Sequence, residues 1–247
     1  MNRLTSRVLK FAALAAVCGF ATEASAGWTL EYNTQVSKGY CIVHESGWSI
    51  QVSSLSGTNI YLRQSLKAPT TVTELDFTEP ITNASGTVYS LVEFSPATTT
   101  SRGVLDGKSW VTSVKLPSTV TVVGCQAFKG CTGLTELELP LSVTTIGIEA
   151  FSGCTNLKSL NLLSTGTLRA LYRSSFTNCS SLTNDIVLGM SGSLTLDSST
   201  GNGIFAGCTK IKDVTLGEGV PTCRNDDGLQ IGGLPPMKFG CVFDGRG

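Results

Sequence analysis

The chain carries little charge and a single histidine. Charged residues make up 15% of its 247 residues, and 18 basic side chains balance 18 acidic ones. A net charge of zero argues against the basic surface with which proteins neutralise nucleic-acid phosphates, so we expect no nucleic-acid partner. So few charges, together with 27 glycines, favour short strands and tight turns over coiled coils or long salt-bridged helices.

The sequence also lacks an apolar run long enough to span a bilayer as a helix. Its longest run, Phe11–Phe20, is about half of the ~20 residues required. Three basic residues precede this run and Ala-Ser-Ala follows it at 24–26, which is the pattern of a signal peptide cleaved after residue 26. We therefore expect a secreted or cell-surface protein without a transmembrane segment in its mature chain. Attachment of a lipid at Cys18 is an alternative, although the residues before it fit a lipoprotein cleavage box poorly.

An internal repeat of about 23 residues is the strongest pattern in the chain. Four copies end in the same Phe-x-x-Cys motif, and the motif recurs at spacings of 23, 25 and 29 residues. The copies cover 110–131, 134–154, 157–179 and 182–208, with another opening at Ile211 and a degenerate one at 72–94. The motif residues are Phe128, Cys131, Phe151, Cys154, Phe176, Cys179, Phe205 and Cys208.

One repeat has two short apolar edges that it cannot bury alone. In the copy at 134–154, Leu137 and Leu139 alternate with polar residues as in a strand, Pro140 ends that strand, and Gly147 is expected to turn the chain. Neighbouring copies must therefore stack to close a core. Equivalent positions would then lie at the roughly 4.8 Å spacing of paired strands, which predicts ladders of leucine, phenylalanine and cysteine.

The motif Leu-x-x-Leu-x-Leu-Pro-x-Ser-Val-Thr-x-Ile-Gly-x-x-Ala-Phe-x-Gly-Cys at 134–154 closely resembles the BspA-like subclass of bacterial leucine-rich repeats. The resemblance is specific over 108–179, looser to 216, and suggestive over 68–107. It implies a β-rich, right-handed solenoid with a parallel sheet on the concave side and short strands and turns on the convex side. It also implies a surface-exposed or secreted protein of the kind that mediates attachment.

The region before the repeats has a different pattern. Three segments of 27–67 alternate polar and apolar residues and are separated by glycines, which predicts two or three short strands. We interpret them as an N-terminal β cap over the first coil, with a small independent binding module as the alternative. After Cys241 the chain stops where another copy would continue, which suggests a fragment, a further partner or an atypical cap. The expected division is a signal peptide at 1–26, the cap at 27–67 and the solenoid at 68–247, with clear repeats at 108–216 and degenerate ones at 68–107 and 217–247.

Eight cysteines follow residue 26, and four of them share one repeat position. We expect those four to be buried and reduced, because stacked side chains point in parallel directions that suit disulfides poorly. Disulfides between neighbouring copies are the alternative. Any bridge that does form would involve the cysteines outside the repeat register, which are Cys41, Cys125, Cys223 and Cys241.

No residue is assigned to catalysis, to a metal or to a cofactor. His44 follows Cys41 by three positions, but Cys-x-x-His is half of a zinc site and no second half follows at a suitable spacing. Asp226 and Asp227 could be the paired carboxylates of a hydrolase, although their Asn/Asp/Gly context is typical of a solvated turn. No glycine-rich phosphate loop is present. We therefore expect a protein that is not an enzyme.

The outward positions of the predicted strands define a binding surface. If Leu137 and Leu139 point inward, Glu136 and Glu138 point outward on the concave face, and the same register applies to every copy. Six acidic residues and one basic residue on this face could dock a basic protein segment or bind divalent cations. A plain solvated face is the alternative. The predicted stripe is Glu74, Asp76, Ser113, Lys115, Glu136, Glu138, Ser159, Asn161, Asp185 with Val187, Asp213 and Thr215.

The sequence thus predicts a secreted or cell-surface repeat protein that binds another protein, such as a host or neighbouring-cell surface protein, in an adhesion-type role. The alternative is a structural spacer of the cell envelope without a specific ligand. We keep both hypotheses open at this stage.

Overall fold

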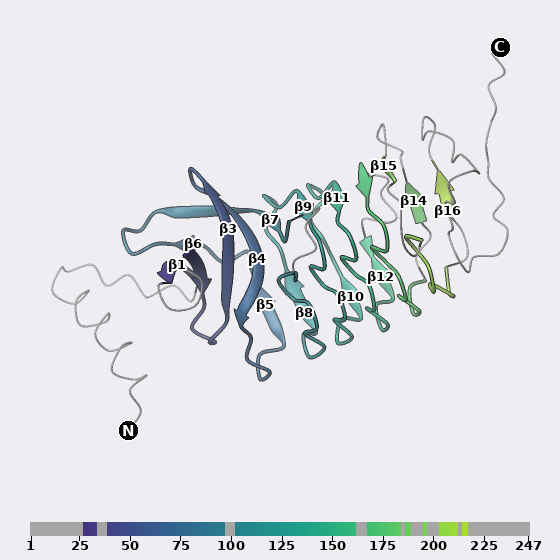
Figure 1. Ribbon diagram of the computed structural model, residues 1–247, viewed down its shortest axis with the longest axis horizontal. Coiled ribbons are helices and arrows are strands. Elements are labelled where there is room, and N and C mark those ends of the chain that lie inside the picture. The colour runs from purple at the N-terminus through teal and green to yellow at the C-terminus, as the bar shows by residue number, and fades with distance from the viewer. Residues whose placement is uncertain are drawn as a thin grey trace, which may run out of the picture.

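A computed structural model describes the part of the chain that carries most of the repeat pattern (Figure 1). Within this part, the regular structure is β-strand and no α-helix occurs. The described residues are 27–33, 39–96, 102–161, 167–183, 186–188, 195–196, 203–211 and 214–216. The predicted signal segment, Asp226 and Asp227, and Cys223 and Cys241 lie outside them.

The strands differ in length between the two ends of the chain. The first four and the seventh are five to nine residues long, whereas the strands of the repeats contain two or three residues. The N-terminal strands are β1 (Trp28–Asn33), β2 (Gly39–Val43), β3 (Ser49–Ser56), β4 (Asn59–Lys67), β5 (Glu74–Asp76), β6 (Ile81–Thr82) and β7 (Val88–Phe94). The later strands are β8 (Ser113–Lys115), β9 (Val122–Val123), β10 (Glu136–Leu137), β11 (Thr145–Ile146), β12 (Ser159–Leu160), β13 (Ala170–Leu171), β14 (Ile186–Leu188), β15 (Thr195–Leu196) and β16 (Val214–Leu216).

Six of the seven N-terminal strands, all except β5, form a closed ring, where the sequence predicted two or three short strands. The hydrogen-bonded order is β7-β4-β3-β2-β1-β6, and β6 pairs with β7 as well as with β1. The ring encloses an apolar core that includes Trp48, Ile50, Ile60 and Leu62, all at most 1% exposed. Because β6 and β7 come from beyond residue 67, the ring extends past the end of the expected cap region.

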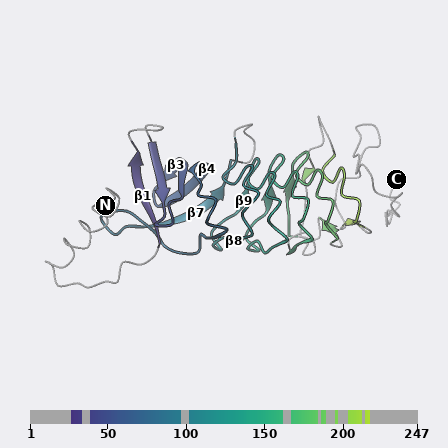
Figure 2. The same cartoon turned by 90° about the horizontal axis from the view of Figure 1, so that it is seen from below.

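The ring passes directly into the repeats through β7 (Figure 2). This strand pairs in parallel with β4 on one side and with β9 on the other, and β9, β11, β13 and β15 continue as a parallel ladder. A second set of parallel pairs, β5–β8, β10–β12 and β14–β16, runs along the repeats. The repeats therefore stack coil on coil in a β-rich leucine-rich-repeat fold. The right-handed sense of the coil stays a prediction.

A column of stacked aromatic rings runs along the interior of the coils. The motif residues Phe128, Phe151, Phe176 and Phe205 are at most 2% exposed, and successive ring centroids are 5.1, 5.2 and 5.3 Å apart. The column continues toward the N-terminus through Phe94, Phe77 and Trp28, at centroid distances of 5.2, 5.2 and 4.7 Å. The repeats and the ring thus share one hydrophobic core.

The cysteines of the motif are buried, free thiols that hydrogen-bond between coils. The Cys154 thiol donates to the carbonyl of Phe128 at 3.0 Å, and the Cys179 thiol donates to the carbonyl of Phe151 at 3.1 Å. Cys131 and Cys208 bond in the same way to the preceding coil. Each thiol therefore fills a small apolar space and also satisfies a buried carbonyl.

Burial should make Cys154 unreactive in the folded protein. It raises the pKa of the Cys154 thiol to about 12, so the nucleophilic thiolate is scarce at pH 8. We expect iodoacetamide at pH 8 to leave Cys154 unmodified in the native chain and to modify it in denaturant, as peptide mass spectrometry would show. Since unfolded thiols ionise near pH 9, the free energy of unfolding should also decline as the pH rises from about 9 to about 12. Rapid modification of Cys154 in the native chain would contradict this burial.

One buried hydroxyl interrupts the apolar register of the third complete copy. Ser175 stands where the earlier copies have Ala127 and Ala150, and its hydroxyl finds no hydrogen-bond partner among the described residues. Ser175→Ala should therefore raise the free energy of unfolding by about 1 kcal/mol and the melting temperature by about 2–4 °C. The reciprocal variant Ala150→Ser should lower both values in a thermal unfolding experiment. An unchanged or lower melting temperature for Ser175→Ala would show that the hydroxyl is satisfied.

Candidate functional site

The described part of the predicted stripe follows the register expected from the alternation. Leu75 and Val114, paired between β5 and β8, are buried, whereas the neighbouring Glu74 and Lys115 are exposed. Leu137 likewise pairs with a buried leucine between β10 and β12. Successive side chains of these strands therefore point alternately into the core and toward solvent.

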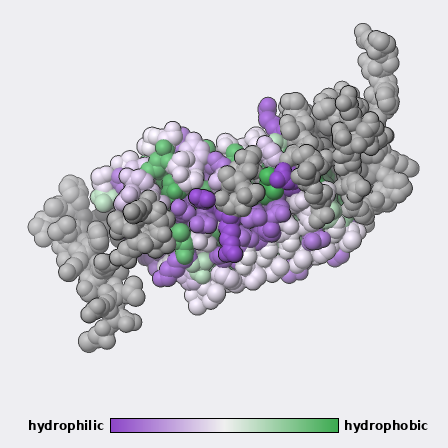
Figure 3. Space-filling model, viewed as in Figure 1, coloured by the Kyte–Doolittle hydropathy of each residue, from purple (hydrophilic) through white to green (hydrophobic). Residues whose placement is uncertain are grey.

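The structure brings the outward residues together in pairs across neighbouring strands. Glu74 lies opposite Ser113, Asp76 opposite Lys115, and Glu136 opposite Ser159. In the later pair of strands, Val187 lies opposite Thr215, while Asp185 and Asp213 are outside the described residues. In the space-filling view, hydrophilic side chains gather over the region of β8 and β10 (Figure 3).

Three stripe residues make internal contacts, and because one of them is the acidic Asp76, the face carries less open negative charge than its number of acidic residues suggests. The Lys115 ammonium lies 3.2 Å from a carboxylate oxygen of Asp76. The side-chain amide of Asn161 bridges to the backbone N–H and C=O of Leu139 at 2.9 and 2.8 Å, which ties two coils together. Glu136 and Glu138 are exposed and form no ion pair with a described residue. Together with Glu74, they carry the open negative charge of the repeat face.

A cleft of about 200 Å³ lies at the N-terminal end of this face, between the ring and the first coil. The ring contributes the β2–β3 turn, and the coil contributes β5, β8 and the segment after β5. The acidic residues Glu74, Asp76 and Glu79 line the cleft, together with Val72, which is partly exposed, and Leu75, which is largely buried. The cleft thus combines an apolar wall with an excess of acidic groups.

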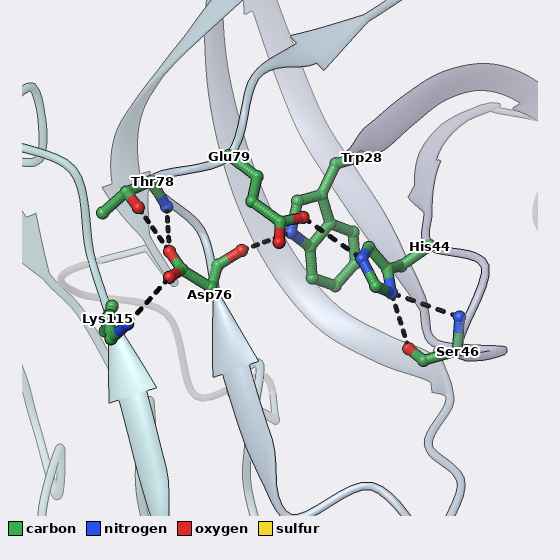
Figure 4. A network of polar contacts seen from close by, with 7 residues as sticks. All are labelled: Trp28, His44, Ser46, Asp76, Thr78, Glu79 and Lys115. Carbon is green, nitrogen blue, oxygen red and sulfur yellow. Dashed lines mark hydrogen bonds and ion pairs between the residues drawn. The ribbon is translucent and has the colours of Figure 1, made fainter. Parts of the chain in front are cut away.

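His44 connects the ring to the coil inside this cleft (Figure 4). It directly follows β2, and its Nε2 lies 3.2 Å from a carboxylate oxygen of Glu79. The Ser46 backbone N–H donates to His44 Nδ1 at 3.2 Å, so Nδ1 is an acceptor and Nε2 carries the ring proton. In this tautomer, Nε2 donates to the Glu79 carboxylate.

Asp76 organises the opposite side of the cleft. Its carboxylate accepts hydrogen bonds from the backbone N–H and the hydroxyl of Thr78 and lies against the Lys115 ammonium, while its backbone carbonyl accepts from the Trp28 indole at 2.8 Å. Partial burial acts to raise the pKa of Asp76, but the Thr78 hydrogen bonds and Lys115 outweigh it and hold that pKa below its usual range. Asp76 is therefore ionised and its negative charge is already matched.

The geometry around His44 is that of a turn rather than of a nucleophilic centre. Ser46 Oγ lies 2.7 Å from Nδ1, but the same nitrogen also accepts from the Ser46 backbone, two residues along the same turn. Gly47 completes this turn with a φ of 92°. Cys41 is buried in β2, and the described residues contain no grouping of three His, Cys, Asp or Glu side chains suited to a metal ion.

Sequence reasoning found four residues of this cleft and missed the others. Glu74, Asp76, Ser113 and Lys115 follow from the strand register of the repeats. Glu79 was missed because it lies in a short connection, 35 positions from His44, with no periodic pattern to mark it. The pairing of these two residues depends on closure of the ring, which no local pattern in the sequence encodes.

Stacked coils with parallel strand pairs, inward leucines and an aromatic column define the class of leucine-rich-repeat proteins. The chain belongs to the family of BspA type leucine rich repeat regions, whose pattern matches residues 101–226 in six copies. The resemblance found in the sequence is thereby confirmed.

Two solved structures are similar to this chain. A leucine-rich repeat protein from Bacteroides ovatus is 23% identical over 68% of this chain and 45% of its own, with a TM-score of 0.45. The pneumococcal vaccine antigen PcpA is 22% identical over 73% of this chain and 51% of its own, also with a TM-score of 0.45. The chain thus spans about half of the length of these two proteins. No curated protein matches the chain.

Proposed function

We propose that the protein is exported, to be secreted or displayed on the cell surface, and that it recognises another protein through its repeat face without catalysing a reaction. Export is supported by the basic start, the apolar run and the small residues at 24–26. In the described part of the chain, no helix has the length and hydropathy needed to cross a bilayer. Stacked repeats commonly provide extended surfaces for binding partners.

The observation that carries this proposal is the open charge of Glu136 and Glu138. Both carboxylates are exposed on the strand face, neither forms an ion pair with a described residue, and the cleft lies at the N-terminal end of the same face. Glu136 and Glu138 lie two positions apart on the same exposed side of the chain at β10, so a partner of opposite charge would offset the repulsion between them. The partner that suits this face is a protein with a basic surface.

The proposal is tested by reversing these two charges. The double variant Glu136→Lys/Glu138→Lys should lose at least tenfold in affinity for a protein that the wild type retains from a cell-surface extract, because charge opposition at an interface disfavours binding. Since both side chains are exposed, the melting temperature should stay within about 2 °C of the wild-type value.

The matched control is Glu31→Lys, which reverses an exposed charge in β1, outside the cleft lining and outside the strands of the repeat face. Its binding should equal that of the wild type. If the double variant retains every partner as well as the control does, the repeat face is not the recognition surface and the spacer hypothesis is favoured.

A further inference from the structure

We propose that the cleft between the β2–β3 turn and the first coil binds one cationic side chain, a lysine or an arginine, of the partner protein. This inference rests on the proposed recognition function and adds the chemistry of one contact. It follows from the size of the cleft, from the charge that remains after its internal pairings, and from its apolar wall.

The size of the cleft fits a single side chain. Pockets for drug-sized ligands usually enclose about 300–1,000 Å³, whereas this one encloses about 200 Å³. It lies at the end of the strand face that carries Glu136 and Glu138, so one residue of a bound segment can enter it while neighbouring residues follow that face.

The charge of the cleft favours a cation. The ammonium of Lys115 is matched by Asp76, and the imidazole of His44 contacts only one oxygen of Glu79. Glu74 is exposed at the cleft and takes part in no described ion pair or hydrogen bond. Glu74 and Glu79 therefore leave the cleft with a net negative charge, which an anionic side chain would have to overcome.

The apolar wall favours a long cationic side chain over a small cation. Val72 lines the cleft and is partly exposed beside the two acidic residues. Lysine and arginine bury their methylene stems against apolar surface while the charged end stays near water or an acid. Trp28 keeps this wall in place, because its indole is bonded to the Asp76 carbonyl and its ring is stacked on Phe77.

The probes are Nα-acetyl-arginine amide, Nα-acetyl-lysine amide and their neutral counterpart Nα-acetyl-norleucine amide. We expect a titration of the purified chain followed by NMR to shift the Trp28 indole N–H and the Ser113 amide in a saturable way with a cationic probe. Because the cleft is open to solvent, the dissociation constant should be in the millimolar range. Norleucine amide should cause no saturable shift.

Substitutions of the acidic residues test which carboxylates bind the cationic probes. Glu74→Gln changes an exposed residue and should weaken binding of the cationic probes at least threefold, and Glu74→Gln/Glu79→Gln at least tenfold. Glu45→Gln, which removes an exposed charge one residue from His44, should leave binding unchanged. Equal shifts with norleucine amide, absence of shifts with both cationic probes, or equal binding by the Glu74→Gln variant would each overturn the proposal.

The same titration separates this inference from the proposed function. The Glu136→Lys/Glu138→Lys variant alters the repeat face outside the cleft lining, so it should bind the probes as the wild type does. If that variant retains its protein partners while the probes still bind, the repeat-face proposal fails and the cleft proposal stands. If that variant loses its protein partners while the probes bind to neither protein, the repeat-face proposal stands and the cleft proposal fails.

Discussion

Replacing Phe151 with alanine should lower the free energy of unfolding by about 3–5 kcal/mol, because it removes a whole ring from the centre of the core. The side chain is fully buried, and its ring is stacked between Phe128 and Phe176 at 5.1 and 5.2 Å, with 5° between the ring planes on each side. Backbone pairing holds the coils at their spacing, so they cannot close over the space that the ring leaves. The measurement is urea unfolding followed by circular dichroism.

Phe151→Leu is the matched control. It keeps most of the apolar volume and loses the stacking with both neighbours, so we expect a loss of about 1–2 kcal/mol. Losses below about 1 kcal/mol for both variants would mean that the coils do close up, and that the aromatic column does not set the stability of the stack.

Gly147→Ala should also be strongly destabilising, by about 3 kcal/mol or more. A Cβ atom at residue 147 would lie 2.5 Å from the backbone carbon and 2.8 Å from the Cα of Gly124, and 2.6 Å from the backbone nitrogen of Cys125. These are backbone atoms of the preceding coil, so no side chain can rotate away. The two coils would have to separate, which weakens the hydrogen bond from the Gly147 N–H to the Val123 carbonyl at 2.8 Å.

The control for this prediction is Gly57→Ala, measured in the same thermal and urea unfolding experiments. Gly57 has a φ of 60° and open space where a Cβ would be, so its substitution costs backbone strain alone, about 1–2 kcal/mol. Gly147 has no such positive φ, and its cost is steric. A Gly147→Ala variant no less stable than Gly57→Ala would show that the coils can separate cheaply at this point.

Gly147 is a residue whose position the sequence pattern predicted correctly but whose structural role it did not. The repeat register placed a glycine at this position, and the expected reason was a turn of the chain. The structure shows another reason, since Gly147 lies against Gly124 of the neighbouring coil, where a side chain would not fit. A one-dimensional pattern locates such a residue, but contact between coils explains it.

In the candidate site, too, the sequence predicted some features and not others. Strand alternation was sufficient to place Glu74 and Lys115 outward and Leu75 inward, because each coil repeats the same short pattern. Alternation could not show that Lys115 is matched by Asp76, nor that the amide of Asn161 is engaged with Leu139. Those contacts depend on distances between side chains of neighbouring strands.

The sequence by itself determined the stacked coils, their inward leucines, the column of phenylalanines and the outward acidic positions. A repeat of about 23 residues carries this information locally, and stacking is the one arrangement that buries both edges of every copy. Only the tertiary structure decided that β6 joins β1 to β7, which closes the ring and brings His44 to Glu79. The physical reason is that strand edges can pair in several ways, and the choice among them is made by packing between distant segments rather than by local pattern.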